Sequence, residues 1–377
     1  MAGRTGEKDD WWVSIPKIEL HAHLNGSIRD STLLELAKSL GEKGSIVFAD
    51  VEHAILKDDR TLTEVFKLFE LIHIVTTDHN ILTRITKEVV EDFAAENVVY
   101  LELRTTPKKN ASIGMSKPSY MEGVIEGLRA VNAVEVALAP HCLGKKGKPF
   151  NSGCVCGTPR KRIYIGLLLS IDRRETTASA METVELALQM RDMGVVGIDL
   201  SGNPTVGEWC TFLPALDFAR KNGLRITLHC GEVPNLDEIQ AMLDFVPERI
   251  GHACCFGEEE WKKLLELKIP VEICLTSNIR TETISSIDVH HFVDLYKAEH
   301  PIILCTDDAG VFSTSLSSEY ILAASTFGLG KQKMLQLAEK AIEFTFADEE
   351  VKEELRQIFD SAARTARRDD LMRKEEE

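Results

Sequence analysis

Short apolar runs and amphipathic helical segments alternate along most of the chain. Apolar side chains recur at helical spacing from Phe212 to Ala219, Gly223 ends this helix, and the apolar run Leu224–Leu228 follows as a strand. The same order of helix, turn and strand recurs further along the chain. Because strands that alternate with helices pair in parallel, the pattern predicts an α/β fold with a parallel sheet.

Eight apolar runs have the length and composition of buried strands. They lie at Lys17–His21, Val98–Leu103, Ile163–Ile171, Gly197–Leu200, Arg225–Leu228, Arg249–Gly251, Val271–Leu275 and Ile302–Cys305. Eight strands favour a closed (β/α)8 barrel of the TIM type over an open doubly wound sheet. The glycine-rich phosphate loop of a Rossmann unit is also absent from the sequence.

One region breaks this rhythm before the third strand. The run Val134–Ala139 resembles another strand, but a loop rich in Gly, Lys, Pro and Cys follows it, so residues 133–161 are predicted to be a loop insertion. The insertion contains four residues that bind metals in other proteins: His141, Cys142, Cys154 and Cys156. Their spacing matches no paired zinc motif, which favours a surface loop over a second metal site.

The composition is that of a soluble, globular protein. The chain has 377 residues, 44% of them hydrophobic, and a formal net charge of -16, which argues against a nucleic-acid polymer as partner. Nine cysteines, an odd number, argue against a disulfide framework. Without an apolar run of ~18 residues or a signal peptide, a cytosolic location away from membranes is expected. Residues 1–363 are predicted to form one domain, and the charge run 364–377 a disordered tail.

Chemistry-bearing side chains follow several of the predicted strands. A barrel enzyme gathers its site at the carboxyl ends of the strands, where His21, His23, His229 and Asp307 are expected. Three imidazoles and one carboxylate form a ligand set suited to Zn²⁺. Taken singly, His229 is equally a hydrogen-bonded core histidine and Asp307 a helix N-cap. The coincidence of all four at strand ends favours one metal site.

Five motifs, in this order, resemble those of the adenosine/AMP deaminase family, whose barrel belongs with the metal-dependent hydrolases. They are Pro16–Ser27, His229–Glu232, Arg249–Ala253, Thr276–Asn278 and Thr306–Asp308. The resemblance covers roughly Pro16 to Ala347 and is highly specific as a set. It implies one Zn²⁺ per chain, held by His21, His23, His229 and Asp307.

The resemblance also implies roles around the purine ring. Glu232 corresponds to the acid that protonates N1, and His252 to the residue that orients and deprotonates the attacking water. Asp308 corresponds to the partner of N7, and the backbone of Gly202 to the donor to N3. His23, Glu232 and Asp308 are therefore expected to contact the substrate. The chemistry is consistent, because attack at C6 destroys purine aromaticity unless N1 accepts a proton.

Asn25 is the most informative departure from the nucleoside deaminases, which usually have Asp at this position. A carboxylate there repels a 5′-phosphate by about 4 kcal/mol per unit charge at ~4 Å and an effective ε of 20, and Asn removes this penalty. The alternative is drift at a tolerant position. The segment Leu101–Lys108 points the same way and resembles the adenosine deaminase-like branch, the N6-methyl-AMP deaminases. In that branch five further residues help to hold the nucleotide: His73, Thr105, Thr106, Lys108 and Asp172.

The leading hypothesis is hydrolysis of N6-methyl-AMP to IMP and methylamine. An adenosine or AMP deaminase that releases ammonia is the first alternative, and an inactive barrel that binds nucleotides or proteins is the second. His73 and Lys108 are as readily ordinary core or surface residues. Five other histidines lie away from strand ends and have no predicted role: His53, His79, His290, His291 and His300. The sequence leaves the N6 substituent and the oligomeric state open, and a monomer is compatible with it.

Overall fold

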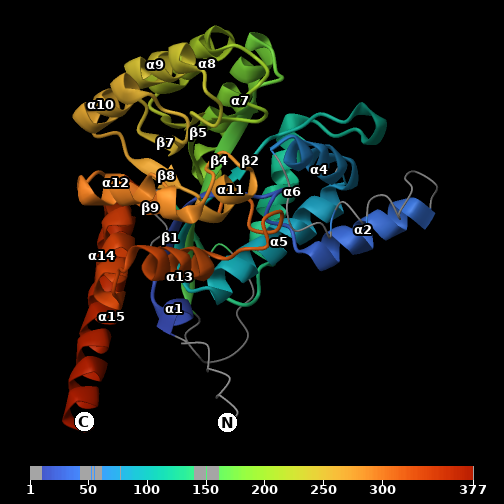
Figure 1. Ribbon diagram of the computed structural model, residues 1–377. Helices are drawn as coiled ribbons and strands as arrows, with labels where there is room; N and C mark the ends of the chain where they lie inside the picture. Colours follow the sequence, from blue (N-terminus) through green and yellow to red (C-terminus); the bar gives the residue numbers. More distant parts are fainter. Residues whose placement is uncertain are drawn as a thin grey trace.

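Eight parallel strands form a nearly closed barrel at the centre of the molecule (Figure 1). The computed structural model describes residues 11–42, 52, 55, 62–76, 78–139, 150 and 161–376. The barrel strands pair in the order β1 (Lys17–His23), β2 (Val98–Thr105), β4 (Arg162–Asp172), β5 (Val195–Ser201), β6 (Arg225–Cys230), β7 (Arg249–His252), β8 (Val271–Ile273) and β9 (Ile302–Leu304). Each predicted strand is present, and the barrel predicted from their number is confirmed.

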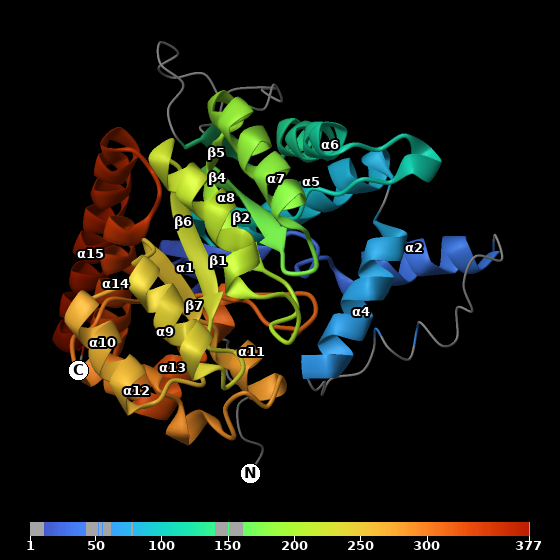
Figure 2. The same ribbon diagram turned by 90° about the horizontal axis from the view of Figure 1, so that it is seen from above.

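Helices cover the outside of the barrel (Figure 2). They are α1 (Trp11–Ser14), α2 (Asp30–Glu42), α4 (Leu62–Val75), α5 (His79–Ala95), α6 (Lys117–Ala130), α7 (Thr177–Gln189), α8 (Trp209–Lys221), α9 (Leu236–Phe245), α10 (Glu258–Leu267), α11 (Leu275–Arg280), α12 (Phe292–Lys297), α13 (Leu316–Phe327), α14 (Lys331–Lys340) and α15 (Glu349–Glu376). Short 3₁₀ turns are η1 (Ala111–Ile113), η2 (Arg191–Met193), η3 (Ile287–Val289) and η4 (Ala341–Phe344). No helix among these described residues has the length and apolar character of a membrane span.

The burial pattern explains why these segments adopt this architecture. Every residue of β2 and β5 is buried, which is typical of parallel strands that are covered on both faces. In α8 the buried side chains Phe212, Ala215, Leu216 and Ala219 form one stripe at helical spacing. Packing that stripe against the strands removes apolar surface from water, at roughly 25 cal/mol per Å².

The first and last strands close the ring at the edge that carries the chemistry. The backbone N–H of His23 donates to the carbonyl of Asp307 over 3.0 Å, and the N–H of Asp307 donates to the carbonyl of His21 over 2.7 Å. The buried Glu19 carboxylate joins the same two segments, since it accepts from the N–H of His21 and from both the N–H and the hydroxyl of Thr306. Closure therefore fixes three candidate metal ligands relative to one another.

Residues 133–161, before the third barrel strand, are predicted to be a loop, but the structure has a strand near the beginning of this region. Residues Glu135–Leu138 form a ninth strand, β3, which pairs in parallel with Arg162–Ile165 of β4. The same edge of β4 pairs with β5 from Leu167 onward, so β3 extends the sheet outside the barrel ring. The strand-like pattern of this run was thus the correct interpretation. The four residues of the insertion that raised the question of a second metal site lie outside the described residues.

The disordered tail predicted from residue 364 is not what the structure shows. Helix α15 continues through it to Glu376 and extends away from the barrel (Figure 1). The segment is rich in Ala, Arg, Glu and Lys, which have high intrinsic helix propensity. Charge density alone therefore does not predict disorder in this segment.

Candidate active site

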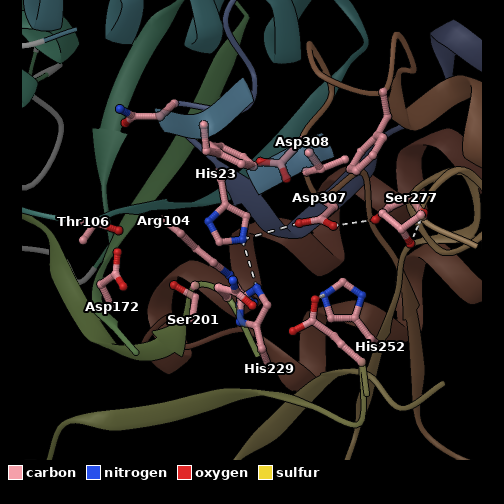
Figure 3. A pocket seen from close by; sticks show the side chains of 18 of the residues that line it. His23, Arg104, Thr106, Asp172, Ser201, His229, His252, Ser277, Asp307 and Asp308 are labelled. Atoms are coloured by element: carbon pink, nitrogen blue, oxygen red, sulfur yellow. Dashed lines mark hydrogen bonds and ion pairs between the residues drawn. The ribbon is translucent and has the colours of Figure 1, made fainter. Parts of the chain in front are cut away.

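Three imidazoles and one carboxylate, those of His21, His23, His229 and Asp307, converge at the carboxyl end of the barrel. Figure 3 shows His23, His229 and Asp307 of this group. Nε2 of His229 lies 3.1 Å from Nε2 of both His21 and His23. Oδ1 of Asp307 lies 3.3 Å from the His21 nitrogen and 3.4 Å from the His23 nitrogen. A tetrahedral ion with ligands at about 2.0–2.1 Å places those ligands about 3.3 Å apart. The four donor atoms therefore fit a single ion of the size of zinc.

The far ring nitrogens of two of these histidines are also held. Nδ1 of His21 lies 2.7 Å from Glu272, and Nδ1 of His229 lies 3.0 Å from Asp199. Hydrogen-bonded carboxylates behind ligating histidines fix the ring orientation and raise ligand basicity. Burial alone raises the pKa of both carboxyls, but the neighbouring cations outweigh it and hold both pKa values below their usual range. The paired partners thus keep Nε2 of both rings aimed at the site.

A buried arginine binds both of these carboxylates. Arg104 donates to Asp199 over 3.0 Å, contacts Glu272, and donates to the carbonyl of Leu20 over 2.8 Å. Sequence reasoning did not assign roles to these three charged residues. Each of the three is a charged residue inside a mostly apolar strand. Because a charged group is almost never fully buried without a partner, this pattern was the signal that could have indicated ion pairs in the barrel.

Asp307 is oriented by a residue from the neighbouring segment. The hydroxyl of Ser277 donates to Oδ2 of Asp307 over 2.7 Å, which leaves Oδ1 to face the histidines. The strand predicted over Val271–Leu275 is shorter in the structure, because β8 ends at Ile273 and Ser277 lies in the helix α11 that follows. Asp307 itself has a φ of 65°, a left-handed conformation that costs a non-glycine residue about 1–3 kcal/mol.

Two carboxyl groups beside the candidate metal group have pKa values above their usual range. Burial raises the pKa of Glu232 to about 7. Burial, reinforced by the nearby carboxylates of Asp307 and Glu232, raises the pKa of Asp308 well above its usual range. Oδ1 of Asp308 has no hydrogen-bond partner among the described residues. Both groups are therefore placed to donate protons or hydrogen bonds to a ligand in the cavity.

His252 ends β7 and lies on the opposite side of the site from His23 (Figure 3). Its Nε2 lies 3.9 Å from Oε1 of Glu232 and has no hydrogen-bond partner within the described part of the chain. Burial holds the pKa of this imidazole well below its usual range. A neutral ring with one unpaired nitrogen thus faces the cavity.

Two glycines make room for polar groups of the site. A Cβ on Gly26 would lie 1.6 Å from Oδ1 of Asp308, so only glycine admits this carboxyl group. Gly202 has a φ of 100°, which side-chain-bearing residues rarely adopt, and a Cβ there would crowd Asp172 at 3.1 Å. Gly202 and Asp172 both line the cavity, as the sequence predicted for them.

The amide of Asn25 is held in one orientation. Its Nδ2 donates to Oγ1 of Thr76 over 3.2 Å, and its Oδ1 accepts from the hydroxyl of Tyr120 over 3.2 Å. Thr76 donates its own proton to the carbonyl of Ile72, so its oxygen is free to accept from the amide. Tyr120 also lies 2.8 Å from the hydroxyl of Thr105. The site is built for an uncharged side chain at position 25.

Basic side chains lie in and beside the cavity wall near Asp172. His73 lines the cavity, and its Nδ1 contacts the ammonium group of Lys108. Burial lowers the pKa of Lys108 to about 7 and that of His73 to about 3, in the latter case with help from Lys108. Asp172 pairs with Arg174 over 2.6 Å, and Arg174 is a cavity residue that the sequence prediction missed. Sequence proximity to Asp172 was the only signal for it.

Most of the predicted site residues line one cavity. They are His23, Asn25, His73, Thr105, Thr106, Asp172, Gly202, His229, Glu232, His252, Asp307 and Asp308. His21 and Lys108 do not belong to the cavity lining, but Nε2 of His21 lies 3.1 Å from Nε2 of His229, and Lys108 contacts His73. Three histidines without a predicted role are buried, namely His290, His291 and His300. His79 lies 3.1 Å from the hydroxyl of Ser119, and His53 lies outside the described residues.

Comparison with known proteins identifies the family. The adenosine deaminase family model matches residues 16–362. The chain belongs to the adenosine deaminase family. It is thus a member of a metal-dependent group of deaminases, and the candidate metal group described above has the donors that such a site requires.

Individual relatives cover nearly the whole chain. N6-mAMP deaminase of Arabidopsis thaliana is 69% identical over 354 residues, which cover 94% of this chain and 99% of that protein. N6-Methyl-AMP deaminase of Homo sapiens is 38% identical over 360 residues, 93% of this chain and 94% of that protein. The crystal structure of Arabidopsis ADAL complexed with IMP is 67% identical, with a TM-score of 0.88, and covers 94% of this chain and 99% of that chain.

Proposed function

We propose that this protein hydrolyses N6-methyl-AMP to IMP and methylamine, with one Zn²⁺ held by His21, His23, His229 and Asp307. The observation that carries the nucleotide preference is the uncharged Asn25, held by Thr76 and Tyr120 in a cavity that also presents cations. The similarity to proteins named N6-methyl-AMP deaminase in a plant and in vertebrates supports the same assignment.

The residues beside the metal group supply the remaining chemistry. When bound, Zn²⁺ lowers the pKa of a water molecule from ~15.7 to ~7 and so provides a nucleophile at neutral pH. Glu232, whose pKa burial raises to about 7, gives its proton in its protonated form to N1 as C6 is attacked. Asp308, kept protonated by burial and by its acidic neighbours, donates a hydrogen bond to N7. The backbone N–H of Gly202 donates to N3.

The outer part of the cavity holds the 5′-phosphate in this proposal. Thr105 and Thr106 offer hydroxyl groups, and Lys108 and His73 offer nitrogen donors on the same side. Arg174 offsets the charge of Asp172, so this carboxylate does not repel the phosphate as a free anion would. The net charge of -16 is compatible with a small anionic ligand, because local cations outweigh the global field over a few ångström.

A substrate panel tests the proposal. The purified enzyme is incubated with N6-methyl-AMP, AMP, N6-methyladenosine and adenosine, and 6-oxopurine and amine products are quantified by chromatography. The expected result is the highest kcat/KM for N6-methyl-AMP, with one methylamine released per IMP. A higher kcat/KM for adenosine than for either 5′-monophosphate overturns the nucleotide assignment. Turnover of none of the four supports an inactive barrel.

A further inference from the structure

A chain of buried hydrogen bonds leads from His290 through Asn278 to His252. Nε2 of His290 lies 3.1 Å from Oδ1 of Asn278, and Nδ2 of Asn278 lies 3.1 Å from Nδ1 of His252. All three residues are buried, with exposed fractions of 0%, 2% and 2%. Neither Asn278 nor His290 belongs to the metal group or to the proton donors described above. Their arrangement determines which nitrogen of His252 carries the proton.

The direction of the chain is set at its outer end. The backbone N–H of Phe292 can act only as a hydrogen-bond donor, and it donates to Nδ1 of His290 over 3.1 Å. A neutral imidazole has one acceptor and one donor nitrogen, so Nε2 of His290 carries the hydrogen. Burial lowers the pKa of His290 to about 2, which keeps the ring neutral. His290 must therefore donate to Asn278.

This donor fixes the amide of Asn278 and, through it, the ring of His252. Oδ1 of Asn278 accepts from His290, so Nδ2 is the atom that faces His252. An amide nitrogen donates only, and Nδ1 of His252 must accept. The reversed amide would need His290 to accept at both of its nitrogens, which a neutral imidazole does not do. The proton of neutral His252 is then on Nε2, which points into the cavity without a partner among the described residues.

His291 fixes the backbone at the same point. Its Nε2 donates to the carbonyl of His252 over 2.8 Å, and its ring stacks on His290 with centroids 4.3 Å apart. The backbone of His252 has a φ of 67°, which costs a non-glycine residue about 1–3 kcal/mol unless its surroundings hold it. The two adjacent histidines thus hold the backbone and the ring of His252 together.

We propose that Asn278 and His290 are positioning residues that hold His252 as the Nε2-protonated tautomer, so that it presents an N–H donor to the reacting oxygen. In this form Nε2 has no lone pair with which to take a proton, and the ring orients and stabilises the nucleophile by donating a hydrogen bond. The proton that the attacking water loses goes to bulk solvent, which requires the site to lower the pKa of that water to ~7. This differs from the proton-accepting role that the family resemblance implies for His252. The inference concerns the family reaction at this site and does not depend on which purine is the preferred substrate.

Nuclear magnetic resonance of the full-length zinc-loaded protein tests the tautomer directly. The chain is labelled with ¹⁵N-histidine, and two-bond ¹H–¹⁵N correlations distinguish protonated from unprotonated ring nitrogens. The signals of His252 are assigned by their loss in His252→Phe. The expected result is an unprotonated Nδ1 and a protonated Nε2. A protonated Nδ1 in the wild-type protein overturns the proposal, whatever the variants do and whatever substrate the enzyme prefers.

Two variants then test the chain of hydrogen bonds. Asn278→Asp replaces the donor with a second acceptor, and it is expected to move the proton of His252 to Nδ1. His290→Phe keeps a ring against His291 but removes the donor, and it is expected to populate both tautomers. Unchanged His252 signals in both folded variants contradict the proposal. Thermal denaturation confirms that each variant is folded, and the wild-type spectrum decides the question if either is not.

Kinetics separate positioning from a general loss of stability. With the substrate that the wild type uses best, His290→Phe is expected to lower kcat on the order of tenfold to a hundredfold with little change in KM. His300→Phe is the matched control, because His300 is also a buried histidine, and it donates to the carbonyl of Ile269, which precedes the amino end of β8 and not the carboxyl end that faces the site. It is expected to leave kcat within about twofold. Equal loss of kcat in the two variants would show that His290 acts through stability alone.

Discussion

Replacing Asn25 with aspartate introduces a charge where the structure provides for a neutral amide. At ~4 Å and an effective ε of 20, a carboxylate repels each unit of phosphate charge by about 4 kcal/mol. At 1.36 kcal/mol per factor of ten, this is roughly a thousandfold loss for a nucleotide and none for a nucleoside. The second acceptor beside Thr76 and Tyr120 costs a further ~1–3 kcal/mol, but that cost falls on both substrates.

The assay therefore compares the kcat/KM of a nucleotide with that of the corresponding nucleoside. Kcat/KM is measured for N6-methyl-AMP and N6-methyladenosine in competition, and Asn25→Asp is expected to lower the nucleotide-to-nucleoside ratio by about a hundredfold to a thousandfold. Thr76→Val is the matched control, because it removes the hydrogen-bond acceptor of the Asn25 amide without adding a charge. It should leave the ratio within threefold of wild type. A ratio that Asn25→Asp also leaves unchanged would refute the electrostatic reasoning.

Three further predictions concern the acid, the metal and the phosphate. Glu232→Gln removes the proton donor, so steady-state kinetics should show a kcat lower by about 10²–10⁴ with KM little changed, whereas a loss confined to KM would assign Glu232 to binding alone. Asp199→Asn weakens the support of His229, and chelator competition should show metal affinity about 10–100-fold lower; unchanged affinity would contradict that role. Because burial lowers the pKa of Lys108 to about 7, the lysine loses its charge as the pH rises through that value. The nucleotide-to-nucleoside ratio of kcat/KM should then fall above pH 7 in the wild type and stay flat in Lys108→Arg, and parallel profiles in the two proteins would rule out the lysine.

The barrel could be predicted because amphipathic helices and apolar strands alternate regularly along the sequence. Helices such as α8 and α13 end at an asparagine or a glycine, most of the buried strands are apolar runs, and parallel pairing brings the strand ends together. This reasoning placed His229 and Asp307, which are 78 positions apart in the chain, at one site. The same reasoning missed β3, because the alternating apolar pattern of this strand is short and the sequence that follows it has the composition of a loop.

The supports of the site were harder to predict because they depend on three-dimensional pairing. Glu272 and Asp199 look like isolated charges in apolar strands until Arg104 is placed between them. The histidine pair at 290 and 291 lies in a polar stretch, and only the structure shows both rings buried behind His252. Side-chain hydrogen bonds across 12 residues of sequence, as between Asn278 and His290, leave no periodic signal.

The metal content of the protein tests the central claim most directly. Elemental analysis of the purified enzyme is expected to give about one zinc ion per chain, and removal by a chelator should abolish turnover until zinc is restored. His229→Ala, which removes one of the four converging donors, should be folded but bind little zinc and have no measurable activity. A metal-free enzyme that deaminates its substrate at the wild-type rate would contradict the account.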